Sequence, residues 1–332
     1  MVGTGCLVGT LTLGLAGLDI DKRVDGRPFL GPGVSAQDLA SRDEAFGHAD
    51  RFDEKYDHVR TLRKGRYTYI RNYQGFYPDG LQNNYRYRML AFQEWRTLHR
   101  AGTLNAAQKQ FFHPRPAEQL FDIHSDPHQV KDLSADPGHH KVLLDLRNRL
   151  RKKVLEINDL SFYPESHQVS NMLDDPIGFG VAHHKEIVFL HDIAALSLTP
   201  LPVALGKLKA HLLSKNPWHR YWACQAVTLI GPPAKPISVA VAVCLGDPHP
   251  MVRLRAAECL AVLKTNIPDP LPVLYDVLNT VPTEAEALLV LNTVVFLRDH
   301  QGLAIDTTRL LPRFPGGQVA RRLEYFKRSS VK

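Results

Sequence analysis

The chain has 332 residues, 44% of them hydrophobic, and a formal net charge of +7. This length can bury two ordinary cores, and the apolar runs are too short to cross a bilayer, so the composition excludes a membrane-spanning protein. Four cysteines without metal-ligand spacing exclude a disulfide framework and a zinc site.

The first 31 residues are interpreted as a short apolar helix end followed by a linker. The stretch from Cys6 to Leu18 has glycines at positions 9, 14 and 17 and no charged region before it, so it does not indicate a signal peptide. We expect it to be a helix severed from its domain, so that the chain begins at an artificial or truncated start.

A basic β-hairpin is the clearest predicted element. The runs from His58 to Arg63 and from Arg66 to Tyr73 are rich in β-prone residues. Lys64 and Gly65 between them supply a two-residue turn. The segment AFGHADRFDE (45–54) lies just ahead of this hairpin, and the segment 83–102 after it predicts a helix.

These segments together resemble the C-terminal part of the sulfatases. The resemblance rests on AFGHADRFDEKYDHVRTLRKGRYTYIRNY (45–73), the helix-like 83–102, and RPAEQLFDI (115–123) with the DP turn and DLS run after it. It extends with less similarity to LGLAGLDIDKRVDGRPFLG (13–31), and it ends near Glu165. The resemblance implies an α+β unit, a small antiparallel sheet with packed helices, in which a last edge strand leads into a closing helix.

The catalytic parts of a sulfatase are not found in this sequence. The family's nucleophile is a formylglycine made from Cys or Ser in a Cys/Ser-x-Pro-x-Arg motif, beside a divalent cation. The four cysteines are followed at the third motif position by Val, Ala, Gly and Ala, no serine stands in the motif, and no acidic residue precedes Asp19. We therefore predict no catalytic residue, no metal ligand and no cofactor in this chain. Calcium and formylglycine are implied only for a complete sulfatase.

The second half predicts helical repeats. Asn216–Gly231 and Asp247–Leu263 each open with an N-cap residue and a proline, Pro217 or Pro248, and then place small and apolar residues at helical spacing. Thr283–Asp299 is a weaker third copy. This pattern resembles short HEAT repeats, which stack into an all-α solenoid. We predict a linker remnant over 1–31, a sulfatase C-terminal subdomain over 32–165 and a HEAT-like domain over 166–332.

Five residues are candidates for contact with an anionic substrate: His48, Asp50, Arg51, Arg63 and Arg66. In related sulfatases the segment that holds the first three faces the catalytic domain, and an arginine there could hold sulfate oxygens in its planar fork. The alternative for Arg51 is an ion pair with Asp53 or Glu54 that holds a loop.

The positive charge of the hairpin has three interpretations. Basic residues at 60, 63, 64, 66 and 71 alternate with aromatic residues, which is a pattern of nucleic-acid surfaces. The same residues suit a sulfated carbohydrate, or simply a solvated sheet face whose charge prevents edge-to-edge aggregation. No nucleic-acid motif accompanies the charge, so nucleic acid is disfavoured.

Two functions from different classes follow. In the first, the chain is the C-terminal part of a sulfuric ester hydrolase, forms one wall of the substrate cleft and pairs with a catalytic domain outside this sequence. In the second, it is a stand-alone, non-catalytic binding or scaffold protein that uses its repeats for a protein partner. Complete sulfatases are often exported, but the sequence itself favours no location.

Overall fold

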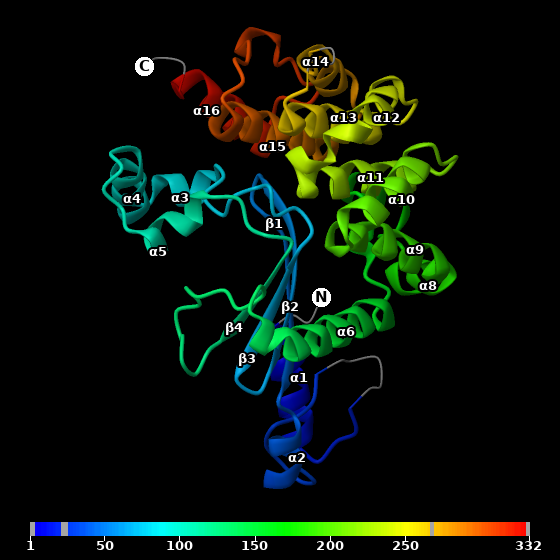
Figure 1. The fold of residues 1–332 in the computed structure, drawn as a ribbon. Coiled ribbons are helices and arrows are strands. Elements are labelled where there is room, and N and C mark those ends of the chain that lie inside the picture. Colours follow the sequence, from blue (N-terminus) through cyan, green and yellow to red (C-terminus); the bar gives the residue numbers. More distant parts are fainter. Residues whose placement is uncertain (1–3, 21–25, 266–268, 330–332) are drawn as a thin grey trace.

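A computed structural model describes residues 4–20, 26–265 and 269–329 of the chain (Figure 1). It contains one small antiparallel sheet followed by a long series of helices, so the predicted α+β class is confirmed. The helices of the first half are α1 (Thr4–Leu15), α2 (Ala36–Ser41), α3 (Asn84–Arg88), α4 (Leu90–Arg100), α5 (Ala106–Lys109) and α6 (His140–Glu156). No helix within the described ranges is long and apolar enough to cross a membrane.

The sheet has four strands in the order β1-β2-β3-β4, and every neighbouring pair is antiparallel. The strands are β1 (Glu44–Phe52), β2 (Lys55–Lys64), β3 (Tyr67–Asn72) and β4 (Glu118–Asp122). The predicted hairpin is β2–β3, and its turn glycine, Gly65, has a φ of 55°, a value that suits glycine. The segment 45–54 is itself a strand, β1, which the hairpin prediction did not include.

The segment between β3 and β4 forms a small helical unit. The single helix predicted over 83–102 is two helices, because Met89 between α3 and α4 has an extended backbone with ψ 125°. Phe92, Leu104 and Phe112 form a separate small core for this unit. Apart from Leu104, the side chains of this core and those packed against it are aromatic.

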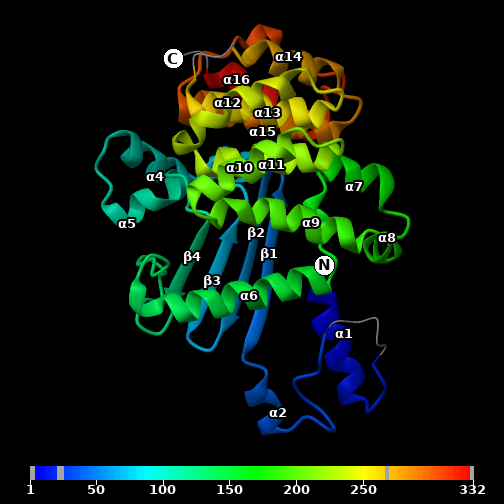
Figure 2. The ribbon, with the colours of Figure 1, turned by 45° about the vertical axis from the view of Figure 1, so that its right-hand side comes forward.

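Helix α6 covers one face of the sheet (Figure 2). Its residues Leu143, Leu146, Leu150 and Val154 are buried at helical spacing, and they belong to the same cluster as the fully buried Leu62 of β2 and Tyr69 of β3. The resemblance implied a closing helix after the edge strand, and α6 occupies that place.

Helices of the second half form an arc around the upper end of the sheet in Figure 1. They are α7 (Glu165–Asn171), α8 (Pro176–Ala182), α9 (His184–Ala195), α10 (Leu201–Leu212), α11 (Pro217–Ile230), α12 (Ser238–Val243), α13 (Pro250–Leu263), α14 (Leu271–Thr280), α15 (Glu284–Gln301) and α16 (Gly317–Ser329). The three predicted repeat helices correspond to α11, α13 and α15.

The start of α13 differs from its prediction. Asn216 caps α11 and Pro217 opens it, as the sequence predicts, but α13 is capped by His249 and opens at Pro250. Asp247 does not cap the helix, because its carboxylate accepts hydrogen bonds from Arg220 and from the backbone of His249. The predicted Pro248 therefore lies in the turn before the helix.

One hydrophobic core runs through both halves of the chain. Buried side chains from Leu62 and Tyr69 in the sheet to Phe326 in α16 belong to a single cluster. The predicted domain boundaries at residues 31 and 165 stay predictions. The hydrophobic core does not stop at residue 165, because side chains on both sides of it belong to this cluster.

Helices α1 and α2 lie at the end of the sheet away from the repeats (Figures 1 and 2). Their segment exposes Leu15 and Leu18, at 52% and 59% of their surface, and Phe29 and Leu30 after the gap in the described residues. The predicted linker includes positions 1–3 and 21–25, which lie outside the described residues. The exposed apolar side chains form a surface that favours association.

We expect removal of residues 1–30 to reduce self-association while leaving the helical signal of the repeats intact. Sedimentation velocity and circular dichroism of the full and shortened chains measure the two effects. A milder variant, Leu15→Ser with Phe29→Ser, should act in the same direction. Identical sedimentation of all three proteins would show that this segment does not cause association.

Candidate functional site

The five predicted substrate residues do not gather in one place. His48, Asp50 and Arg51 lie on β1, close to the connection that follows α6. Arg63 and Arg66 flank the β2–β3 turn at the other end of the sheet. Each group therefore has its own surroundings.

Asp50 belongs to a buried ion-pair network around Arg60. The regular β1–β2 register shifts between Ala49 and Arg51, and Asp50 in this bulge lies 2.9 Å (Oδ1) from Nη1 of Arg60. Arg60 also donates to Asp159, with Nε–Oδ2 at 2.5 Å and Nη2–Oδ1 at 3.0 Å. Burial raises the pKa of Asp159, but the charge and hydrogen bonds of Arg60 outweigh burial and bring it to about 2.

The two carboxylates respond differently to the same arginine. Burial raises the pKa of Asp50 by more than the Arg60 charge lowers it. Arg60 itself is only 2% exposed, and its guanidinium is shared between the two acids. Asp50 therefore holds the sheet to the 159–161 connection, where Ser161 donates a further hydrogen bond to it at 3.3 Å.

Arg51 forms an ion pair, but with a residue far along the chain. Its Nε donates to Oε1 of Glu165 at 2.5 Å, and its Nη2 pairs with the other oxygen. Its Nη1 donates to the backbone oxygen of Asp53 at 3.3 Å, while the side chains of Asp53 and Glu54 are not its partners. The alternative predicted for Arg51, an ion pair with Asp53 or Glu54, is therefore wrong in its partner, because the acid is Glu165.

Arg66, Arg63 and His48 differ in whether an ion pair already holds their side chains. Arg66 donates from Nε to Oδ1 of Asp122 at 2.8 Å, and this hydrogen bond lowers the pKa of Asp122. Arg63 is exposed, and within the described part of the chain it forms no ion pair. His48 is exposed beside the ring of Phe46. In the β1–β2 register His48 stands opposite Arg60, and Ala45 stands opposite Arg63. Arg60 and Arg63 are three residues apart on β2, so His48 and Arg63 point to opposite faces of the sheet. Their roles in substrate binding stay predictions.

The face of the sheet opposite α6 is open over β1, β2 and part of β3. In the register, Ala45, Gly47 and Ala49 of β1 stand opposite Arg63, Thr61 and Val59 of β2, and Thr68 and Ile70 continue the same face on β3. All of these residues are exposed or half-buried. The face is made mainly of small or apolar side chains, with Arg63 at one end.

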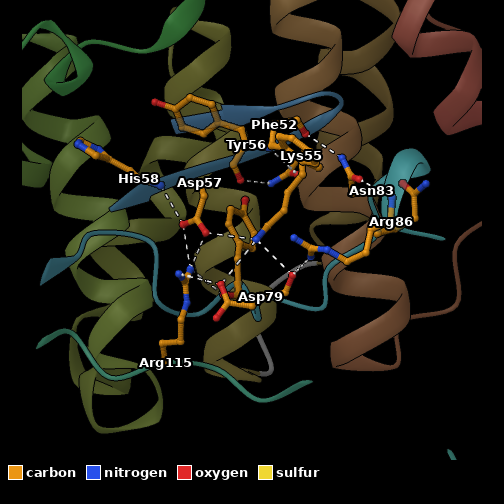
Figure 3. Close-up of polar contacts among 12 residues, drawn as sticks. Phe52, Lys55, Tyr56, Asp57, His58, Asp79, Asn83, Arg86 and Arg115 are labelled. Atoms are coloured by element: carbon orange, nitrogen blue, oxygen red, sulfur yellow. Dashed lines mark hydrogen bonds and ion pairs between the residues drawn. The ribbon is translucent and has the colours of Figure 1, made fainter. Parts of the chain in front are cut away.

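A second ionic cluster, which sequence reasoning missed, joins β2 to two loops (Figure 3). Arg115 donates from Nη2 to both oxygens of Asp57, at 2.9 and 2.8 Å, and its Nη1 lies 3.2 Å from Asp79. Lys55 donates to Asp57 at 3.3 Å, and burial lowers the pKa of Lys55. In the sequence, the one local indication of this cluster is that two oppositely charged residues, Lys55 and Asp57, flank Tyr56 on β2 and so point to the same face. The charges neutralise one another, so the cluster holds the loops in place.

The halves of the chain meet in buried polar contacts. Tyr77, which lies between β3 and β4 in the chain, donates its hydroxyl hydrogen to Glu258 of α13, and Arg255 pairs with Glu258 at 2.7 Å. Tyr56 of β2 exchanges two backbone hydrogen bonds with the side chain of Asn292 in α15, both at 3.2 Å. These contacts fix the hairpin against the repeats.

The last helix also reaches the sheet. Arg322 of α16 is fully buried and donates from Nη2 to the backbone oxygens of Glu54 at 2.9 Å and Gln82 at 3.0 Å. Burial lowers the pKa of Arg322 to about 10. This cation is thus held by carbonyl oxygens of two loops.

Metal ligands do not gather in the described ranges. No group of three or more His, Cys, Asp or Glu side chains there could hold a metal ion.

Comparisons with known proteins identify the two kinds of unit. Residues 205–292 match the family described as HEAT repeats, and this range runs from within α10 through α11, α12, α13 and α14 into α15. This region of the chain is therefore similar to HEAT repeats, as the sequence pattern predicted.

The chain is also 36% identical over 155 residues to the ulvan-active sulfatase of Formosa agariphila. The match takes in 45% of this chain and 24% of the relative, so it spans about a quarter of the relative's length. The predicted combination of a sulfatase-related part with HEAT-like repeats is confirmed.

Proposed function

We propose that this chain is the C-terminal part of a sulfatase-family sulfuric ester hydrolase and forms one wall of its substrate cleft. The nucleophile and the metal ligands then come from a catalytic domain outside this sequence. The relative's name describes activity on ulvan, and a sulfated carbohydrate is the substrate class that we propose here.

The open face of the sheet is the observation that carries this proposal. The sheet face that α6 leaves uncovered would normally be polar if it met only water. Here it bears Val59, Ile70, alanines and threonines instead of mainly charged residues. Small side chains allow a second surface to approach closely over a wide area. Among the described residues Arg63, at the end of the face, has no ion-pair partner, and its guanidinium is suited to an anionic group near the rim of the contact.

The alternative is a stand-alone binding or scaffold protein that uses the repeats. Val239 and Val243 on α12 are 73% and 65% exposed, which gives the repeats an apolar surface of their own for a protein partner. The reading frame before residue 1 in the source genome separates the two functions. A Cys/Ser-x-Pro-x-Arg motif and paired aspartates in that frame support the hydrolase, and a promoter with a ribosome-binding site there supports the scaffold.

We expect the chain alone not to hydrolyse an aryl sulfate, and we expect turnover when it is produced together with the catalytic domain encoded before it. Thr61→Arg, at the middle of the open face, should lower the turnover of the combined protein by about tenfold or more, because it places a charge in the contact. Thr97→Arg, on the exposed side of α4, is the matched control and should have no effect.

Two results would contradict the proposal. One is turnover by rigorously purified chain alone that a substitution within this chain abolishes. The other is full activity of the Thr61→Arg protein, which would show that the open face does not meet the catalytic domain.

A further inference from the structure

A cavity lies where the small helical unit of the first half meets the last helices of the second. Its walls come from α4, from the end of α15 with the loop after it, and from α16, and its volume is about 650 Å³. The rings of Tyr87 and Tyr325 meet edge to face across this junction, with their centroids 5.6 Å apart. A volume of this size suits a small molecule such as a mono- or disaccharide.

The cavity is positively charged. Arg96 and Arg100 lie four residues apart on α4, which places them on one side of the helix, and Arg298 of α15 joins them. Within the described residues neither Arg96 nor Arg100 forms an ion pair. Among the described residues that line the cavity Asp299 is the one carboxylate, and it already accepts hydrogen bonds from Arg298 and from the hydroxyl of Tyr325, both at 2.7 Å. The guanidinium groups of Arg96 and Arg100 therefore keep their positive charge and attract an anion into the cavity.

Two buried nitrogen atoms of the lining residues have no hydrogen-bond partner in the part of the chain that the structure describes. They are Nδ1 of His99 and Nη2 of Arg298. Leaving a buried polar atom unpaired costs free energy, so such atoms are uncommon unless a ligand or water satisfies them. Burial, together with the charges of His113 and Lys109, lowers the pKa of His99, so its ring is neutral at pH 7 and can give or accept a hydrogen bond.

Aromatic rings hold the cationic groups in place. The guanidinium of Arg96 lies 3.7 Å from the centroid of the Tyr87 ring, and that of Arg298 lies 4.8 Å from the Tyr325 ring. The ring of His99 stacks on Phe112 at 4.2 Å. A guanidinium stacked on a ring keeps its N–H edges available, and these edges match the oxygens of a sulfate or phosphate group. The aromatic surfaces suit the apolar face of a sugar ring.

We propose that this cavity binds a saccharide that carries a sulfate or phosphate ester. The ester group lies between Arg96, Arg100 and Arg298, and the sugar ring rests against the aromatic walls. The site is formed wholly within this chain, and it goes beyond the wall of a catalytic cleft proposed above. It would serve to hold a charged chain near the protein without reaction at the site.

Calorimetric titration of the full chain at low salt tests this site. The ligands are a monosulfated monosaccharide, the corresponding monosaccharide phosphate, the uncharged monosaccharide and inorganic sulfate. We expect both esters to bind more tightly than the uncharged sugar and than inorganic sulfate, and the tighter of the two identifies the natural ester. Binding should weaken as salt rises, because it depends on charge.

Substitutions locate the binding. Arg96→Gln and Arg100→Gln should each weaken binding of the preferred ester by about tenfold, since each removes a charge-assisted contact. Arg321→Gln on α16 removes an exposed arginine away from the cavity and should leave binding unchanged. Thermal unfolding of each variant verifies that it is folded.

Absence of binding by both esters at low salt would overturn the proposal, and so would full binding by the doubly substituted Arg96→Gln, Arg100→Gln protein. Equal affinity for inorganic sulfate and for the sulfated sugar would overturn the saccharide part, because the aromatic walls would then contribute nothing. All of these measurements use this chain without a catalytic domain, so their failure is distinct from failure of the proposed hydrolase.

Discussion

Replacing Arg60 with methionine should lower the free energy of unfolding by about 3–5 kcal/mol, because it leaves the carboxylate of Asp159 buried without its cation. Chemical denaturation of the two proteins at pH 7 measures the difference. The doubly substituted Arg60→Met, Asp159→Asn protein should recover part of the loss, since it removes the unpaired charge as well.

Arg63→Met, three residues further along the same strand, is the matched control. Arg63 is exposed and unpaired within the described residues, so its replacement should change the stability by less than about 0.5 kcal/mol. Equal losses for the two variants would mean that the ion-pair network around Arg60 is not what stabilises this end of the sheet.

The second large effect is a loss of stability between pH 7 and pH 5. His58 is 1% exposed and lies among the rings of Tyr73, Phe162 and Trp222. Burial lowers the pKa of His58 well below its usual value, and the nearby charges of Arg60 and Arg71 act in the same direction. Asp159 and Asp57 oppose them without reversing the shift.

The sign of the effect follows from proton binding. Below pH 6.5 the unfolded chain binds a proton at His58 more readily than the folded chain does, so folding becomes less favourable as the pH falls, by at most about 1.4 kcal/mol per pH unit. Burial also lowers the pKa of further histidines, which add to the trend: His99, His167, His191, His211, His219, His249 and His300.

Denaturation at a series of pH values measures this slope. His58→Leu should reduce the slope below pH 6.5 whatever it does to the absolute stability, while His124→Leu at an exposed position should leave it unchanged. A slope that stays the same in His58→Leu would assign the acid sensitivity to other groups.

Local patterns in the sequence predicted the local elements well. Alternating β-prone residues and Lys64-Gly65 were enough for the β2–β3 hairpin, and the Asn216-Pro217 pair marked the start of α11. Strand β1 was missed because its exposed and half-buried residues do not alternate strictly, as its two faces have different neighbours. The break at Met89 was missed because no proline or glycine marks it.

The candidate sites were harder to predict because their partners are distant in the sequence. Arg51 pairs with Glu165, and Arg66 pairs with Asp122, so a single sequence gives no indication that their charges are already used. The cavity beside α4 depends on how α15 and α16 pack, and its arginines lie at ordinary helix positions. Only packing brings such residues together.

The contacts of Arg322 with the loops after β1 and β3 also affect how the chain folds during its synthesis. Repeat proteins usually gain structure one unit at a time, since each unit touches only its neighbours. Here a side chain of α16 completes the surroundings of Glu54 and Gln82, which leave the ribosome much earlier. Contacts between such distant parts of a chain slow folding and make it cooperative. We therefore expect the β1–β2 turn to gain its full set of contacts only after α16 has emerged from the ribosome.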